Sequence, residues 1–144
     1  NMCMTPDRIA EKLTARTKAV VVVHYGGYAI DVEALRSALP ARVAIIEDAA
    51  HALGSQYPNG RPVGSSENLV CFSFYANKNL STADGGAIAL FDRHKAERLR
   101  SLRMSGMDSN AWSRYTNPST AFVAGVEELG YKMNFTDLQA AIGG

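Results

Sequence analysis

The sequence CFSFYANKNLSTADGGAIALF, residues 71–91, decides how the sheet of this protein is built. It holds the end of one apolar run, 68–75, and all of a second, 86–91, and the polar link between them contains Lys78. Parallel neighbours need about a dozen or more residues between them, usually as a helix, and this link is shorter. We therefore predict antiparallel strands here, with Lys78 in the connection that joins them.

Upstream of this pair, apolar runs alternate with helical patterns. Residues 19–25 and 42–48 are dominated by Val and Ile, which is typical of parallel strands covered on both faces. A regular order of helix, strand, helix and strand favours parallel strands joined by helical crossovers. The predicted fold class is therefore α/β, with a mostly parallel sheet, helical crossovers and one antiparallel strand over 86–91.

Four helices are predicted from their start signals. Thr5 precedes the first as a capping hydroxyl, directly before a proline. Asp31, Asp92 and Thr136 precede the other three in the same way. Before the last helix lies a segment over 105–125 that is rich in Gly, Ser, Asn and Pro, and we predict a long irregular loop there.

The bulk composition narrows the class of protein. The 144 residues carry a formal net charge of +1, so we expect neither a nucleic-acid nor a membrane partner. No apolar run approaches the roughly 20 residues that span a bilayer, and no signal-peptide layout is visible, so the cytoplasm is the expected compartment. Two cysteines make no disulfide framework. Because both ends interrupt a pattern, we expect residues 1–144 to be one partial domain of a longer protein.

The side chains that could take part in catalysis or binding follow the strands at one edge of the predicted sheet, where parallel sheets bind their ligands. A lysine on a loop usually has no role, but a partly desolvated amine at this edge, as expected for Lys78, is a nucleophile able to form a Schiff base. Asp48 either caps a helix over residues 49–54 or pairs with the protonated ring nitrogen of pyridoxal phosphate (PLP). The second interpretation makes the edge a cofactor site.

His51, His24 and Ser73 also lie near this edge, and each allows more than one interpretation. His51 lies three residues after Asp48, and if the two share one helical turn their side chains point the same way. A metal site built from Asp48, His51 and His24 has spacing too loose to support it, so no metal is expected. Ser73 either satisfies a backbone group or donates to a phosphate.

Four stretches occur in an order and spacing that resemble the DegT/DnrJ/StrS family of sugar aminotransferases, which are PLP enzymes of fold type I. They are EDAAHALGSQYPNGRPVGS (47–65), CFSFYANKNLSTADGGAIAL (71–90), RLRSLRMSGM (98–107) and GYKMNFTDLQAAIG (130–143). The resemblance covers essentially the whole chain, and four linked motifs are far more specific than a single lysine. It implies the central segment of the large, PLP-binding domain, without the N-terminal part and the C-terminal small domain.

The resemblance implies a role for each candidate residue. Lys78 corresponds to the lysine that holds PLP as a Schiff base and then moves the proton between substrate and cofactor carbons. Asp48 corresponds to the acid that keeps the pyridine nitrogen protonated, and His51 stands near the phenolic oxygen of the cofactor. Ser73 corresponds to a phosphate ligand. Asn134 corresponds to an asparagine that reaches a phosphate in the neighbouring subunit, which implies a homodimer with shared active sites.

The resemblance also implies the reaction. An amino acid, usually glutamate, gives its amine to PLP, and the amine passes to a keto-sugar carried on a nucleotide, for polysaccharide or antibiotic sugars. Lysine at position 78 favours this over the dehydration performed by relatives that have histidine there. The alternatives are a PLP-dependent sugar dehydratase and a catalytically incompetent segment that serves only folding or assembly. His24, Tyr25 and Trp112 are as well explained by core or surface roles as by contact with the sugar.

Overall fold

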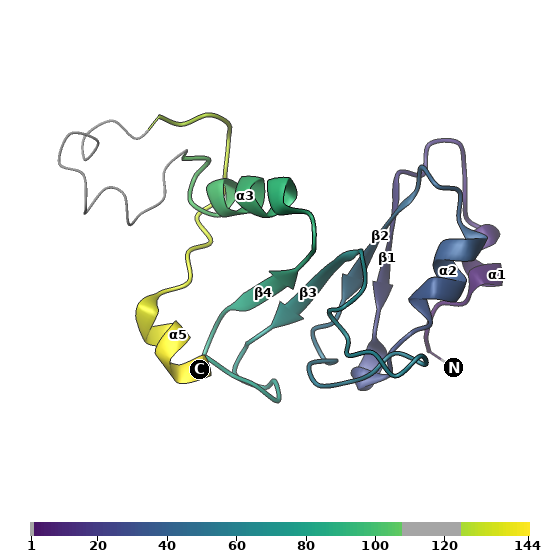
Figure 1. Ribbon diagram of the computed structural model, residues 1–144, viewed down its shortest axis with the longest axis horizontal. Coiled ribbons are helices and arrows are strands. Elements are labelled where there is room, and N and C mark those ends of the chain that lie inside the picture. The colour runs from purple at the N-terminus through teal and green to yellow at the C-terminus, as the bar shows by residue number, and fades with distance from the viewer. Residues whose placement is uncertain (1, 108–124) are drawn as a thin grey trace. The chain divides into compact units, whose positions relative to one another are not determined.

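The computed structural model describes residues 2–107 and 125–144 (Figure 1). The chain forms two compact units, one of residues Asn1–Leu90 with Asp137–Gly144 and one of residues Phe91–Thr136. Most of the predicted loop over 105–125, including Trp112, lies outside the described residues. The expectation that residues 1–144 make one partial domain stays a prediction.

A four-stranded sheet forms the centre of the first unit, with the strands in their sequence order. The strands are β1 (Ala19–Val23), β2 (Ala44–Asp48), β3 (Leu69–Ser73) and β4 (Gly86–Ala89). The first three are parallel, and β4 runs antiparallel to β3. The predicted α/β class and the single antiparallel strand are therefore confirmed, although β4 ends at Ala89 rather than at residue 91.

Three short helices and a single 3-10 turn complete the first unit. They are α1 (Pro6–Ala10), the 3-10 turn Tyr25–Gly27, α2 (Val32–Ala38) and α5 (Asp137–Gly143). The Asp31 carboxylate accepts from the backbone N–H of Ala34 at 2.9 Å, as the cap prediction requires. The predicted hydroxyl cap at Thr5 is wrong, since its side chain makes no capping bond; α1 begins instead on Pro6, whose ring presets the first φ.

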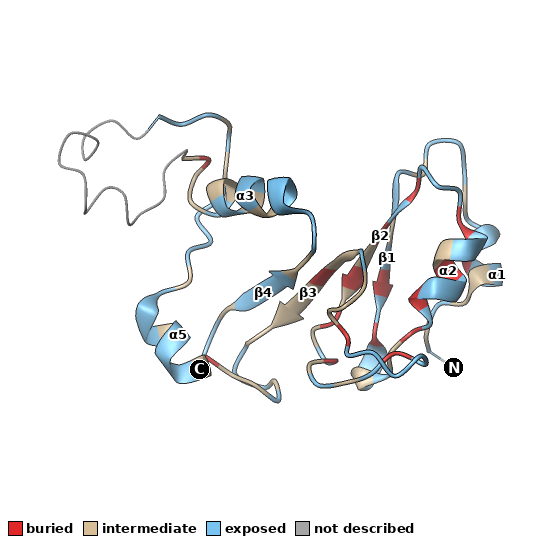
Figure 2. Ribbon diagram, viewed as in Figure 1, coloured by how far each residue is buried: buried red, intermediate tan, exposed pale blue. Residues whose placement is uncertain are grey.

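The core of the first unit lies on one face of the sheet, where α1 and α2 pack (Figure 2). Alternate strand residues point to this face, so β1 contributes Val22 and β2 contributes Ile45. Each fully buried aliphatic side chain contributes about 1.5–3 kcal/mol. A second cluster under the segment that follows β2 contains Val32, Ala49, Ala52, Tyr57, Val63 and Val70.

The other face of the sheet is much more open. The side chains of Val21 and Val23 on β1 are 51% and 39% exposed, and Ile88 on β4 is 45% exposed. The expectation that β1 is covered on both faces is therefore wrong for the residues that the structure describes. The reason is that the described helices of the crossovers lie on the face of Val22, and no layer among the described residues covers the face of Val21.

The second unit is built on α3 (Arg93–Leu102), which Asp92 caps by accepting from the N–H of Lys95 at 3.1 Å. A chain segment near Glu128 and Tyr131 lies along the end of this helix. Glu128 holds Arg98 through two parallel bonds of 3.0 and 2.9 Å. Tyr131 accepts from the N–H of Ser105 at 2.9 Å through its carbonyl. These bonds join α3 and Ser105 to residues 128–131 within the second unit.

Candidate functional site

A hollow of about 340 Å³ opens where β1, β2 and β3 end. Its lining residues are Gly26, Ala50, His51, Asn77, Lys78 and Asn79. Each of the three parallel strands is followed by residues of this set, so the hollow lies at the carboxyl edge of the sheet. This is the edge where open α/β sheets bind ligands. The structure therefore brings two of the predicted site residues, Lys78 and His51, to one opening.

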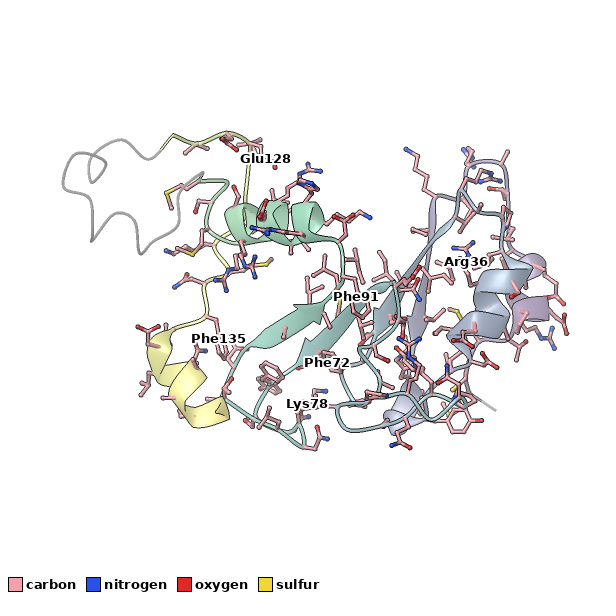
Figure 3. All side chains as sticks on the ribbon, in the orientation of Figure 1. Arg36, Phe72, Lys78, Phe91, Glu128 and Phe135 are labelled. Atoms are coloured by element: carbon pink, nitrogen blue, oxygen red, sulfur yellow. The ribbon has the colours of Figure 1, made fainter. Side chains whose placement is uncertain are left out.

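Lys78 lies in the connection between β3 and β4, which Figure 3 shows at the edge of the sheet. The connection is held at its base by Phe74, whose N–H donates to the carbonyl of Gly85 at 2.8 Å and whose carbonyl accepts from Thr82 at 3.0 Å. Nearer the tip, the N–H of Lys78 donates to the carbonyl of Tyr75 at 3.0 Å. Lys78 is half-buried, and the turn that carries it lies at the rim of the hollow.

Asp48 is the last residue of β2, and its carboxylate accepts from the N–H of Ala50 at 3.0 Å. The N–H of Ala52 donates to the carbonyl of Ala49 at 2.9 Å, which makes this segment a tight turn. The idea that Asp48 and His51 share one helical turn is therefore wrong. The helix cap predicted at Asp48 is wrong for the same reason, because its carboxylate caps a turn and not a helix. Its other carboxylate oxygen accepts no hydrogen bond from the described residues.

Asp48 and Ser73 point to the same face of the sheet. Asp48 pairs with Cys71 in the parallel register of β2 and β3, and Ser73 lies two residues beyond Cys71. The Ser73 hydroxyl oxygen accepts from the N–H of Tyr75 at 3.3 Å, which leaves its proton available to an anion. Neither residue lines the hollow. The two lie on neighbouring strands beside it, on the more open face.

Gly27 explains how the turn after β1 approaches the His51 segment. Its φ is +85°, and a Cβ placed on it would lie 2.9 Å from the carbonyl oxygen of His51. The carbonyl of Gly27 also accepts from the Ser55 hydroxyl at 2.8 Å. Only glycine combines this conformation with this approach, so the wall of the hollow formed by Gly26 and His51 depends on it.

Directly beneath this edge lies a buried polar network centred on Glu47. The side chains of His24 and Glu47 are fully buried, and His24 Nε2 lies 2.8 Å from Glu47 Oε2. Tyr57 donates its hydroxyl to the same oxygen at 2.6 Å. Ser66 and Asn68 donate to Oε1 at 2.5 and 2.8 Å. The carboxylate therefore accepts four hydrogen bonds, which satisfies a charge that would otherwise be costly to bury.

The hydrogen bonds determine the tautomer of His24 and influence the pKa of Glu47. Ile30 donates its N–H to His24 Nδ1 at 3.0 Å, so this nitrogen carries no proton and Nε2–H is the donor to Glu47. Burial raises the pKa of Glu47, but the hydrogen bonds it accepts, led by that of His24, outweigh burial and bring its pKa below the ordinary value. Burial, with the bond to Glu47, raises the pKa of Tyr57 to about 12.

This network was missed by sequence reasoning, which placed Glu47 and His24 at strand ends without pairing them. The signal was present, because an acid two residues after Ile45 points to the same covered face and needs a buried partner. His24 is a core residue and makes no contact with the hollow, whereas Tyr25 is half exposed beside it.

The remaining predicted residue, Asn134, is exposed and belongs to the second unit. Its role stays a prediction. The described residues contain no group of three or more His, Cys, Asp or Glu side chains arranged to hold a metal ion. Among those same residues no helix has the length and apolar character to cross a membrane.

Three known proteins are similar to this chain over almost its whole length. The spore coat polysaccharide biosynthesis protein SpsC of Bacillus subtilis is 42% identical over 139 residues, which are 96% of this chain and 35% of SpsC. The sugar aminotransferase CalS13 of Micromonospora echinospora has a TM-score of 0.84 at 34% identity, over 99% of this chain and 38% of that one. The putative sugar aminotransferase Spr1654 of Streptococcus pneumoniae, in its PLP form, has a TM-score of 0.83 at 27% identity, over 99% and 39%.

The chain spans about a third of the length of the curated relatives it matches. The DegT/DnrJ/EryC1/StrS aminotransferase family matches over residues 1–144. The four-stranded sheet, with one antiparallel pair, agrees with the solved neighbours across almost the entire chain. On these grounds the chain belongs to the DegT/DnrJ/EryC1/StrS family of aminotransferases.

Proposed function

We propose that the polypeptide carrying these residues is a PLP-dependent aminotransferase that moves an amino group from an amino acid, expected to be glutamate, to a keto-sugar carried on a nucleotide. One observation carries the proposal: the ordered connection that bears Lys78 borders a hollow at the carboxyl edge of a parallel sheet, one strand away from the unpaired carboxylate oxygen of Asp48. The family match and the sugar aminotransferases among the structural neighbours support the reaction class.

The residues present suit this cofactor. PLP supplies an electron sink when bound, because its protonated ring accepts the electron pair released at the substrate carbon. Lys78 would hold the cofactor through its amine and would move a proton at the substrate carbon. The free oxygen of Asp48 would accept a hydrogen bond from a protonated ring nitrogen.

His51 and Ser73 would orient the cofactor. His51 lines the same hollow as Lys78, and its exposed ring can donate to a phenolic oxygen. Ser73 can donate its hydroxyl proton to a phosphate. Asn134 is proposed to reach the phosphate of a neighbouring subunit, which makes the active form a homodimer with shared sites. The proposed compartment is the cytoplasm, and the proposed products are amino sugars for polysaccharides or antibiotics.

The test compares Lys78→Ala with Lys12→Ala in the full-length protein. Lys12 is an exposed lysine far from the hollow in sequence and serves as the matched control. After incubation with PLP and reduction with borohydride, mass spectrometry of the peptides should find the cofactor on Lys78 in the native protein and in Lys12→Ala. Lys78→Ala should carry no such label and should not transaminate. Cofactor attached to a different lysine would refute the assignment, and product analysis with a keto-sugar nucleotide separates amination from dehydration.

A further inference from the structure

We propose that the buried pair His24 and Glu47 is a positioning device that holds the end of β2 so that the Asp48 carboxylate is presented to the cofactor ring. The inference rests on the proposed function, since it assumes that Asp48 pairs with the ring nitrogen. It assigns to His24 and Glu47 no contact with substrate or cofactor, because both are fully buried and neither lines the hollow.

The first support is the way His24 holds two consecutive residues of β2. Its backbone N–H donates to the carbonyl of Asp48 at 3.0 Å. Its ring Nε2–H donates to the carboxylate of Glu47 at 2.8 Å. One residue at the end of β1 therefore fixes the main chain of Asp48 and the side chain of its neighbour together.

The second support is the alternation of the strand. Glu47 pairs with Val22 and Val70, which are fully buried, and so it points to the covered face. Asp48 pairs with Val23 and points to the more open face. Because consecutive side chains of a strand leave it in opposite directions, a rotation of β2 that loosened Glu47 would turn Asp48 by the same amount. Fixing one carboxylate fixes the direction of the other.

The third support is that both carboxylate oxygens of Glu47 already accept two hydrogen bonds each. Four donors from three separate segments converge on its two oxygens: His24 at the end of β1, Tyr57 in the segment after β2, and Ser66 and Asn68 before β3. A carboxylate with a donor at each lone pair has one allowed orientation, which a carboxylate in water does not.

The fourth support is energetic. A buried carboxylate commonly adds no stability over an apolar group of the same shape, because its desolvation penalty is as large as the gain from the hydrogen bonds that it accepts. An apolar pair in this core would hold the layers together without fixing a direction. The presence of a directional network beside Asp48 is therefore better explained by orientation than by stability alone.

The experiment uses full-length protein reconstituted with PLP labelled with ¹⁵N in the ring, and it measures the NMR shift of that nitrogen. Glu47→Gln keeps the size of the side chain but turns an amide NH₂ toward the Nδ2 donor of Asn68, so that side of the network opens. We expect the ring shift to move toward the value of Asp48→Asn. We also expect kcat to fall by about tenfold or more with KM for the amine donor little changed, as for a misplaced reacting group.

Leu35→Ala is the matched control. Leu35 is fully buried on α2, belongs to the hydrophobic cluster that does not contain Tyr57, and does not line the hollow. It should lower the melting temperature at least as much as Glu47→Gln while the ring ¹⁵N shift stays native. If Glu47→Gln does not fold, Tyr57→Phe removes a single donor to the same oxygen and should move the shift in the same direction by a smaller amount.

The outcomes separate the two claims. If the ring shift depends on Asp48 but remains native in both Glu47→Gln and Tyr57→Phe, the positioning role is wrong and the proposed function stands. If the native protein holds no PLP, or its ring shift is the same in Asp48→Asn, then the proposed function itself is wrong. If the shift moves equally in Leu35→Ala, the effect is general loosening and the inference is overturned.

Discussion

Asn79 donates its side-chain amide to the backbone carbonyl of Leu53 at 2.7 Å. Asn79 follows Lys78 directly, and Leu53 follows the turn that begins at Asp48, so one bond ties together the two segments that carry the proposed catalytic groups. The side-chain Oδ1 of Asn79 accepts from the N–H of Leu80 at 3.2 Å, which sets the direction of the side chain. The separation of Lys78 from the turn after Asp48 therefore depends on the side chain of Asn79.

Replacing Asn79 with alanine should loosen this tie. The bond contributes about 0.5–1.5 kcal/mol, and because Asn79 is exposed we expect the lower end for global stability. Local effects should be larger: amide hydrogen exchange at residues 76–80 should accelerate, and the affinity for PLP should fall. Asn59→Ala is the control, since Asn59 makes a matching pair of bonds, one to Glu33 and one from Arg61, away from the hollow. Equal exchange at 76–80 in the two variants would count against the tie.

Asp48→Asn should bind PLP more weakly than the native protein and lose most of the transamination rate. An amide cannot stabilise a positive charge on the ring nitrogen, while it can still accept from the N–H of Ala50. Single-turnover kinetics of the full-length protein with glutamate measure the loss. A native rate in this variant would remove Asp48 from its proposed role, and the melting temperature should change little because the capping bond is kept.

The network at Glu47 predicts how stability depends on pH. The folded-state pKa of Glu47 lies below its unfolded value, so the network's contribution is complete above the unfolded pKa and is lost as pH falls through the folded value. The free energy of unfolding by urea should therefore decrease on the acid side, below about pH 4.5. In Glu47→Gln this acid-side slope should be smaller. An unchanged slope in the variant would mean that other carboxylates cause the acid loss.

Gly27→Ala and Gly26→Ala make a matched pair that separates steric approach from backbone conformation. Both glycines have positive φ, at +85° and +60°, so alanine costs about 1–2 kcal/mol at either position. Only at Gly27 would the new Cβ meet a neighbour, the carbonyl oxygen of His51 at 2.9 Å, while at Gly26 nothing lies within 4 Å. Urea unfolding should show Gly27→Ala to be the less stable of the two, and equal values would contradict the close approach.

Much of the first unit could be predicted from the sequence because its signals are local. Unbroken Val and Ile runs predicted β1 and β2, and the short link with Lys78 predicted that β4 runs against β3. The cap at Asp31 followed from one side chain and its position. The side-chain capping bond expected at Thr5 is not formed. The helix still begins there, because proline at the first helical position favours a helix start.

The candidate site was predictable in part. Its place at the carboxyl edge follows from strand direction alone, which brings Lys78 and His51 to one hollow. The tight turn after Asp48 did not follow, because an Asp carboxylate can cap a helix or a turn with the same bond to the N–H two residues on. The partners of Glu47 come from segments ten to twenty-three residues away, and only the folded chain shows that they meet.

The adjacent side chains of Glu47 and Asp48 thus lie on opposite faces of β2, and this limits which insertions and deletions the gene can accept. Deleting or inserting a single codon within Ala44–Asp48 would exchange the destinations of the two side chains, driving Asp48 into the packed interior and Glu47 out of it. Changes of length are tolerable only in the flanking connections, so related proteins should keep the five-residue length of β2 itself even where the residue types differ.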